Sequence, residues 1–405
     1  MDKIILHCDL NNFYASVEVK NHPEYKDKPV AVAGDPNKRT GIILAKNQLA
    51  KEQGVTTGEV IWMAKQHCPD LICLAPHHEE YAKISKQVHE IYLKYTDYVE
   101  PFGLDECWLD VTNSTRLFGD GMTIANKIRQ EVKDKIGLTI SVGVSFSKMF
   151  AKLGSDLKKP DAVSIISRDN YKTVAWNLPV NAMMFVGKHR VEKLQKMNIN
   201  TIGNLANFNP SILKEQFGIN GIYLHQVANG CEPDVVAKYD EHRQIKSIGN
   251  GTTAIKDIDN LYQAKQVIYY LSEMTSTRLR EKGLECLCIT LDIKDNELHT
   301  VGKAKTIQHS TSNASEIAKV ALEILSEKWN WHTDKKIRAL RVKCSTLIDA
   351  GDNKQLNIFY QNDKKNDKKD ESIDKIRQKY GFSSIKRGVL LNANILNIEA
   401  EDDYF

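Results

Sequence analysis

The chain of 405 residues lacks the sequence features of several protein classes. None of its eight cysteines forms a Cys-X-X-Cys pair, which argues against a zinc ribbon, and their scatter predicts reduced thiols rather than disulfides. The N-terminal apolar run is too short for a secretory signal peptide and ends at an aspartate. No segment approaches the roughly 18 consecutive apolar residues of a membrane span. These absences predict a soluble intracellular protein.

The composition shows no strong bias either. Hydrophobic residues make up 41% and charged residues 27%, which is ordinary for a globular protein. The formal net charge of +4 permits an acidic partner, but a solvated lysine surface would give the same total. The length predicts two or more domains.

Residues 1–166 alternate predicted strands and helices around a mixed sheet. Strands are expected at residues 1–9, 28–35, 138–147 and in the second half of 99–112. Helices are expected towards Gly54, at residues 78–96 and 121–137, and after residue 147.

Residues 167–233 contain no predicted strand. Glycines between short helices, next to Lys and Arg, favour helix-hairpin-helix elements, whose turn amides and helix N-termini can hold a phosphate. A plain helical connector fits this stretch equally well.

Residues 241–347 predict the order β-α-β-β-α-β, which is typical of a ferredoxin-like module. Lys303 and Lys305 on the third strand, with Arg243 and Lys246 near the first, suggest a basic sheet face. Such a face would suit a sugar-phosphate backbone. A solvated sheet face is the alternative. In the tail at 348–405, the charged low-complexity stretch QNDKKNDKKDES predicts disorder before a short helix.

Carboxylates occur where two of the predicted strands end or begin. Asp9 closes one strand and Asp105–Glu106 opens another. If these strands are neighbours, three carboxylates converge at one sheet edge and could bind Mg²⁺, which takes oxygen ligands. Two such ions about 4 Å apart can activate an attacking oxygen and stabilise a leaving one. Each acid could instead cap a helix or lie in solvent.

Three motifs then occur in order: DLNNFYASVE, LDECWLD and SVGVSFSKMFAKLGSDLKKP. With them, residues 1–347 resemble a Y-family translesion DNA polymerase. The resemblance implies a low-fidelity, template-directed enzyme that adds dNTPs to a primer 3′-OH opposite damaged DNA, as part of the SOS response. No segment resembles a proofreading exonuclease. The chain is most similar to the UmuC/UvrX-like branch, because Asn11 stands where DinB-type polymerases usually carry a second Asp.

The resemblance implies an α+β multidomain architecture and a set of metal ligands. A palm with a mixed sheet is expected at 1–10 and 77–166, small fingers at 11–76, a helical thumb at 167–233, and a ferredoxin-like little finger at 241–347. By resemblance, Asp9 and Asp105 bind two Mg²⁺ ions. The Leu10 main-chain carbonyl would join the nucleotide-side ion, and Glu106 would complete the primer-side site.

The nucleotide site implied by the family differs here in its cations. Tyr14 matches the steric gate against a ribose 2′-OH, with Phe13 beside it, and Lys159 matches the triphosphate lysine, with Lys158 as a possible substitute. Lys51 stands where many relatives have arginine and lacks the bidentate fork. Gln48 replaces a tyrosine of DinB-type members, so the triphosphate contacts are expected to differ.

The resemblance also implies macromolecular partners. Primer-template DNA would contact the thumb hairpin at Gly187 and Lys188, although Phe185 stands where relatives commonly have a first glycine. In the tail, Gln355, Leu356, Ile358 and Phe359 resemble the motif by which bacterial proteins bind the sliding clamp (β). The alternative is that this segment is a final strand of the last domain. A UmuD-like accessory subunit is a further expected partner of an otherwise monomeric protein in the bacterial cytoplasm.

Two other functions fit parts of the sequence. A nucleotide cyclase also has a palm-like sheet with paired carboxylates, but it does not need helical hairpins or a basic terminal module. A non-catalytic DNA- and clamp-binding factor would not need Asp9, Asp105 and Glu106 intact.

Overall fold

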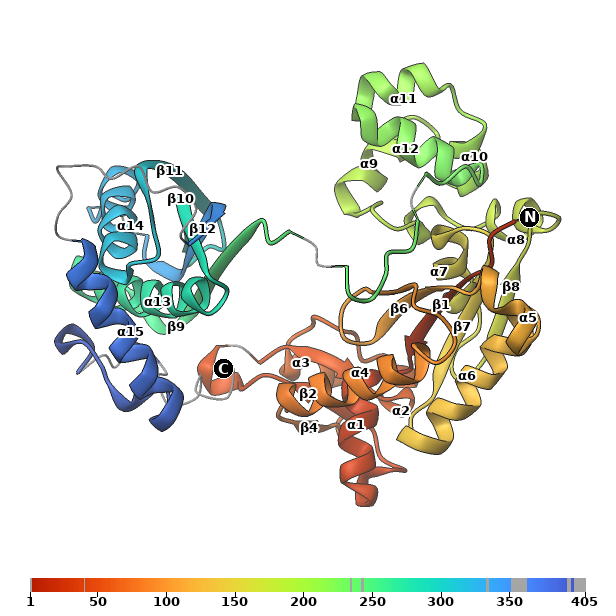
Figure 1. Ribbon diagram of the computed structural model, residues 1–405, viewed down its shortest axis with the longest axis horizontal. Helices are drawn as coiled ribbons and strands as arrows, with labels where there is room; N and C mark the ends of the chain where they lie inside the picture. Colours follow the sequence, from red (N-terminus) through yellow and green to blue (C-terminus); the bar gives the residue numbers. More distant parts are fainter. Residues whose placement is uncertain are drawn as a thin grey trace. The chain divides into compact units, whose positions relative to one another are not determined.

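The computed structural model describes residues 2–39, 41–233, 235–241, 244–332, 335–350, 363–391 and 395–396 (Figure 1). These residues form two compact units, one made of residues 1–33 and 43–242 and the other of residues 34–42 and 243–405. Within the described part of the chain, no helix combines the length and the apolar character needed to cross a membrane.

A five-stranded sheet is the centre of the first unit, in the order β5-β6-β1-β7-β8. Its strands are β1 (Ile5–Leu10), β5 (Val99–Pro101), β6 (Glu106–Asp110), β7 (Ile140–Ser145) and β8 (Val163–Ile166). All neighbours are antiparallel except β7 and β8, which are parallel. The predicted mixed sheet is confirmed, and β8 is a strand that the sequence patterns did not indicate.

Helices cover both faces of this sheet. Helices α4 (His78–Tyr92) and α6 (Gly121–Ile136) pack against Leu6, Cys8 and Leu10 of β1. On the opposite face lies α7 (Lys148–Leu157). It approaches closely because β7 has a glycine there: a Cβ at Gly143 would lie 1.9 Å from the carbonyl oxygen of Ala151. The short α5 (Thr115–Phe118) precedes α6.

The strand predicted at 28–35 belongs to a separate sheet, which corrects the expectation of one sheet in residues 1–166. Its order is β3-β2-β4, with β2 (Val30–Ala33), β3 (Ile43–Lys46) and β4 (Ile72–Leu74). The accompanying helices are α1 (Phe13–Asn21), α2 (Gln48–Glu52) and α3 (Ile61–His67). This sheet has a core of its own, built around Ala31, Ile43 and Ala64.

The segment after β8 is helical, as predicted. It contains α8 (Tyr171–Ala175), α9 (Lys188–Lys196), α10 (Ile202–Ala206), α11 (Pro210–Phe217) and α12 (Ile219–Ala228). Buried Leu194, Leu205 and Leu224 join these helices to Phe150 and Leu153 of α7. The helical segment therefore packs on the helix that also carries part of the site described below.

The second unit has the predicted β-α-β-β-α-β order. Its elements are β9 (Ser247–Ile258), α13 (Leu261–Glu281), β10 (Leu284–Asp295), β11 (Thr300–Thr311), α14 (Ala314–Lys328) and β12 (Ile337–Asp349). The sheet is antiparallel in the order β11-β10-β12-β9, and both helices cover one of its faces (Figure 1). The other face of this sheet carries no helix of the module.

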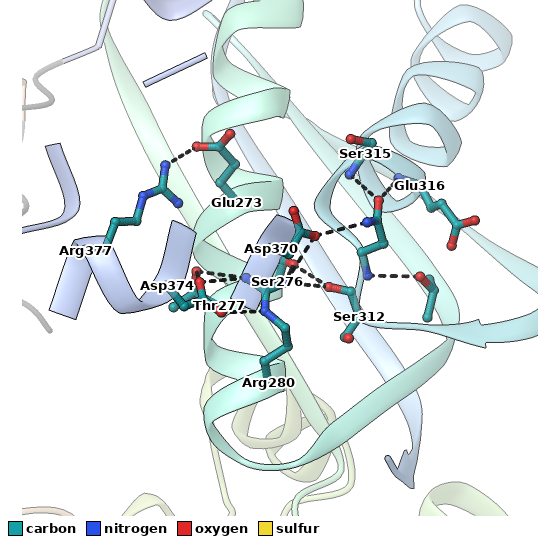
Figure 2. Close-up of polar contacts among 12 residues, drawn as sticks. Glu273, Ser276, Thr277, Arg280, Ser312, Ser315, Glu316, Asp370, Asp374 and Arg377 are labelled. Atoms are coloured by element: carbon teal, nitrogen blue, oxygen red, sulfur yellow. Dashed lines mark hydrogen bonds and ion pairs between the residues drawn. The ribbon is translucent and has the colours of Figure 1, made fainter. Parts of the chain in front are cut away.

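The tail corrects the prediction of disorder. Most of QNDKKNDKKDES lies in α15 (Asp363–Tyr380). Asp370 and Asp374 pair with Arg280 of α13, and Arg377 pairs with Glu273 of the same helix (Figure 2). Spacings of four and three residues place these three α15 side chains on one helix face. Asp370 of this stretch, and Asp374 and Arg377 after it, thus have partners on α13 that composition alone does not reveal.

Candidate active site

The register of β1 and β6 brings the predicted carboxylates together. Asp9 is paired directly with Glu106 across the two strands. One step further, the backbone N–H of Leu10 donates to the carbonyl oxygen of Asp105 at 2.9 Å. Because side chains alternate along a strand, Asp9 shares the α7 face of the sheet, whereas Leu10 lies in the opposite core. The four residues predicted as metal ligands therefore lie at one sheet edge.

Helix α7 brings a lysine between the two paired acids. Nζ of Lys152 lies 3.2 Å from Oδ2 of Asp9 and 2.9 Å from Oε1 of Glu106. Ser147 caps the helix by accepting from the N–H of Phe150. The sequence analysis missed Lys152. No sequence signal indicated it, because its position depends on how closely α7 approaches β7 at the contact between Ala151 and Gly143.

The second lysine was predicted. Nζ of Lys159 lies 2.8 Å from Oδ2 of Asp9 and 2.8 Å from Oδ1 of Asp156. Of the two adjacent lysines, Lys159 is the one whose contact with Asp9 the structure shows, whereas Lys158 is exposed.

The environment drives the acid pKa values apart. Burial, reinforced by the charges of Glu106 and Asp9, raises the pKa of Asp105 to about 6. Burial alone would also raise the pKa of Glu106, but the contact with His7 and the charge of Lys152 lower it to about 2. Burial opposes the charge of Lys152, yet Asp9 and Glu106 raise the pKa of its ammonium group. The ends of β1 and β6 thus carry several carboxylates, and the ammonium group of Lys152 compensates part of their negative charge.

This arrangement fits hard cations. Like charges directly opposite each other on two strands are destabilising, so the Asp9–Glu106 pair is favourable only with positive charge beside it. Carboxylate and carbonyl oxygens are the ligands that Mg²⁺ takes. Among the described residues, the tightest group of ligand-type atoms is elsewhere, at Asp295, Glu297 and His299, where Lys335 already pairs with both acids.

Two aromatic residues follow the site at the start of α1. Phe13 is buried in the core, with its ring centroid 5.5 Å from that of Tyr14, so it supports the neighbouring ring. The Tyr14 ring stacks on Tyr81 with centroids 4.2 Å apart and an interplanar angle of 14°. The Tyr81 hydroxyl donates to buried Glu18. Burial and then the charge of Asp105 raise the pKa of Tyr14.

Asn11 has a structural reason to be an amide. Its Nδ2 donates to Oγ of Ser141 at 2.9 Å, and its Oδ1 accepts from the N–H of Asp161 at 2.8 Å. A carboxylate could accept but not donate. Asn11 therefore links the ends of two chain segments beside the site.

The fingers lysine lies in α2. Lys51 is exposed, and burial together with the charge of Lys51 lowers the pKa of Lys46 on β3. Lys46 is thus a second cation close to Lys51 that the sequence analysis did not single out. Gln48 donates to Glu52 at 2.9 Å on the same helix.

The helical hairpin is exposed at its turn. Gly187 is the N-cap of α9 and Lys188 is its first residue, and both are exposed. Phe185 has φ 66° and its carbonyl oxygen accepts from Nη1 of Arg190 at 2.5 Å. A φ in the left-handed region explains why a glycine would be expected at this position.

The predicted basic face of the second unit needs correction. Lys303 and Lys305 pair across β10 with Leu291 and Ile289, so they share the helix-covered face, where they form ion pairs with Glu327 and Glu323 of α14. The alternation of β12 instead places Arg341 and Lys343 on the uncovered face. A shift of one residue exchanges the faces, and sequence alone did not resolve it.

Other predicted contacts lie partly outside the described residues. Lys246 is exposed just before β9. Arg243 and the motif residues Gln355, Leu356, Ile358 and Phe359 fall outside the part of the chain that the structure describes.

Two models of one protein family match this chain. Residues 8–156 match the model of the impB/mucB/samB family, and residues 245–358 match that family's C-terminal domain. A DNA polymerase IV from Acetivibrio thermocellus is 47% identical over 98% of this chain and 100% of its own. A second DNA polymerase IV, from Clostridium kluyveri, is 35% identical over 96% of this chain and 99% of its own.

Solved structures show the same architecture. A Y-family DNA polymerase chimera matches with a TM-score of 0.76 and 25% identity, over 85% of this chain and 99% of its own. DinB from Sulfolobus solfataricus matches with a TM-score of 0.55 and 25% identity, over 84% of this chain and 98% of its own. The palm, fingers, thumb and little finger predicted from the sequence are thereby confirmed as a fold class.

Proposed function

This chain belongs to the Y family of DNA polymerases, and on that premise we propose that it copies damaged templates with low fidelity and without proofreading, by two-metal-ion nucleotidyl transfer. As the comparisons show, it is a DNA-directed DNA polymerase. The observation that carries the proposal is the edge at which Asp9 faces Glu106 and Leu10 contacts Asp105.

The finer placement in the UmuC/UvrX-like branch is revised. The relatives described above are named DNA polymerase IV, which places the chain with the DinB-type enzymes. Asn11 misled the assignment because its amide has a local bonding role.

The residues at the edge divide the chemistry. Asp9 and Asp105 would hold two divalent cations, generally Mg²⁺, with the Leu10 carbonyl on the nucleotide side and Glu106 on the primer side. When bound, such ions supply a Lewis acid for the attacking 3′-hydroxyl and for the leaving pyrophosphate. Lys159 neutralises triphosphate charge, with Lys51 and Lys46 as further cations of the fingers.

Tyr14 supports selection of deoxyribose. Its ring is held by the stack on Tyr81, which Glu18 fixes in turn, so the gate has little freedom to move away. A sugar with a 2′-hydroxyl is then rejected by a clash rather than by a missing attraction.

Primer-template DNA would contact both units. In the thumb, exposed Gly187 and Lys188 would offer the backbone of the α9 N-terminus and a positive charge to the DNA. In the little finger, Arg341 and Lys343 lie on the uncovered sheet face and take the place that Lys303 and Lys305 were expected to have. Lys246, exposed just before β9, remains a candidate, as does Arg243, which lies outside the described residues.

The tail would tether the enzyme at the replication site. A sliding clamp (β) bound through Gln355, Leu356, Ile358 and Phe359 would raise the effective concentration of the polymerase at a primer end. A UmuD-like accessory subunit, a monomeric state, a bacterial cytoplasmic location and a role in the SOS response complete the proposal.

Primer extension tests the proposed gate. On an undamaged template and on an abasic one, the wild type should add dNTPs and reject rNTPs. Tyr14→Ala should accept rNTPs at least about tenfold better, because the clashing ring is gone. Tyr262→Ala, which removes a surface tyrosine of the little finger, is the matched control and should behave as wild type.

Two further measurements on the same protein, formation of a cyclic nucleotide from ATP and binding of primer-template DNA, separate the alternative functions. Conversion of ATP to a cyclic nucleotide without extension would favour a cyclase. Binding of primer-template DNA without extension, even with a sliding clamp added, would favour the non-catalytic factor. A Tyr14→Ala variant that still rejects rNTPs would refute the gate.

A further inference from the structure

His7 is a buried polar residue with no part in the roles described so far. It lies on β1 two residues before Asp9, on the same face of the sheet, and its side chain is fully buried. Trp108 is its cross-strand partner on β6, with ring centroids 5.2 Å apart, and Gly143 is its partner on β7. Burying an imidazole here is costly unless its nitrogens are satisfied.

Each ring nitrogen faces one polar group. Nδ1 lies 2.9 Å from Oγ of Ser155, a fully buried residue of α7. Nε2 lies 3.2 Å from Oε2 of Glu106. Within the described part of the chain, neither Nε2 nor this Oε2 has a partner in hydrogen-bond geometry, so their 3.2 Å approach is a close polar contact that is not aligned as a hydrogen bond. The imidazole therefore bridges α7 and the candidate metal ligand.

The contacts favour one tautomer of the uncharged ring. With its hydrogen on Nε2, the ring presents a positive N–H edge to Oε2 of Glu106, while Nδ1 and the carbonyl oxygen of Lys152, 2.8 Å from Oγ, are alternative acceptors for the Ser155 hydroxyl hydrogen. With the hydrogen on Nδ1, a lone pair of Nε2 would face a carboxylate oxygen at 3.2 Å, which is repulsive. The Nε2–H form therefore replaces a repulsion at Glu106 with an attraction.

We propose that His7 is a positioning residue that fixes the carboxylate of Glu106 for metal binding through the chain Ser155–His7–Glu106. Oε2 is held by the ring, so Oε1, which faces Lys152 at 2.9 Å, keeps a constant orientation towards the edge. The inference rests on the proposed role of Glu106 as a primer-side ligand. Groups that orient a metal ligand in this way typically contribute about 10–100-fold in metal affinity or activity.

Two amide variants separate hydrogen bonding from packing. His7→Gln can extend an N–H about as far as Nε2 and so keep the contact with Glu106. His7→Asn reaches only as far as Nδ1 and loses it. Ser155→Ala leaves the ring in place and removes its Nδ1 partner, which provides a milder second variant.

The first readout is Mn²⁺ binding to the full-length, DNA-free protein, followed by the electron paramagnetic resonance of free Mn²⁺. His7→Asn should bind about 10–100-fold more weakly than wild type, and His7→Gln should restore most of the affinity. Ser155→Ala should fall between wild type and His7→Asn. Thermal denaturation of each variant verifies folding.

The second readout is single-turnover incorporation. His7→Asn should lower the maximal rate while the apparent Kd for the dNTP stays within about twofold, because only the primer-side ligand is disturbed. Equal Mn²⁺ affinity in His7→Asn, Ser155→Ala and wild type would overturn the inference. So would a His7→Gln variant that is folded but as weak as His7→Asn. A wild type that binds Mn²⁺ but never extends DNA would refute the proposed function and leave the His7 comparison decisive.

Discussion

Among single side chains, Asp105 shows how a catalytic edge costs stability. Burial and the charges of Glu106 and Asp9 raise its pKa to about 6, so in the absence of metal the ionised form opposes folding at neutral pH. The unfolded chain has no such penalty. A residue that the proposed reaction requires is therefore one whose ionised form destabilises the metal-free fold.

We predict that Asp105→Asn is inactive but more stable than wild type in EDTA at pH 8, by on the order of 1–3 kcal/mol. The gain should shrink as the pH falls through 6 and vanish below about 4, where Asp105 is protonated in both the folded and the unfolded state. Urea denaturation at pH 8, 6 and 4 measures it.

Asp110→Asn is the control for this comparison. The Asp110 carboxylate accepts from the N–H and the hydroxyl of Thr112, so its loss should give no gain. An Asp105→Asn variant less stable than wild type at pH 8 in EDTA would contradict the electrostatic interpretation.

Among the helices and strands, α7 and α15 mark the limits of sequence reasoning. The strands that carry Asp9 and Glu106 were predictable, because apolar runs end at carboxylates. Lys152 was not, since its position depends on how closely α7 approaches Gly143. The short tail helix was predicted, but its early start was missed, because the partners of its charges, Glu273 and Arg280, lie about a hundred residues away.

The face of a strand was the other limit. The sequence predicted that Lys303 and Lys305 form a basic surface. They lie opposite Leu291 and Ile289 on β10, however, and residues paired across strands share a face, so both lysines point towards α14. Only the register of β10 and β11 decides this, and register depends on packing that one strand's sequence does not contain.

For α15, we predict that Glu273→Gln destabilises the little finger by about 3 kcal/mol. Glu273 is buried and pairs with Arg377 at 2.6 Å and also with Arg387, so its neutralisation leaves buried guanidinium charge uncompensated. Denaturation followed by the fluorescence of Trp329 and Trp331 measures the loss.

Glu297→Gln is the matched control. The Glu297 side chain is 55% exposed in its pair with Lys335, and its loss should change stability by less than about 0.5 kcal/mol. Equal effects of the two substitutions would show that the buried pairs do not hold α15 in place.

For the chain as a whole, DNA affinity should depend on the uncovered face of the little finger. We predict that Lys343→Ala weakens binding of primer-template DNA and reduces the slope of log K against log salt by about 1, as expected for one lost phosphate contact. Arg341→Ala should act in the same direction. Fluorescence anisotropy at several salt concentrations gives both quantities.

Lys303→Ala removes the same charge from the helix-covered face. It should leave the salt slope nearly unchanged, whereas a larger effect of Lys303→Ala than of Lys343→Ala would return the DNA contact to β11.

Mg²⁺-dependent addition of one templated nucleotide tests the central claim most directly. The account predicts incorporation of the complementary dNTP by wild type and by Asp134→Ala, a surface carboxylate of α6, and none by Asp105→Ala. The reaction should stop in EDTA and resume when Mg²⁺ is restored. Incorporation by Asp105→Ala at the wild-type rate would contradict the assignment of the catalytic edge.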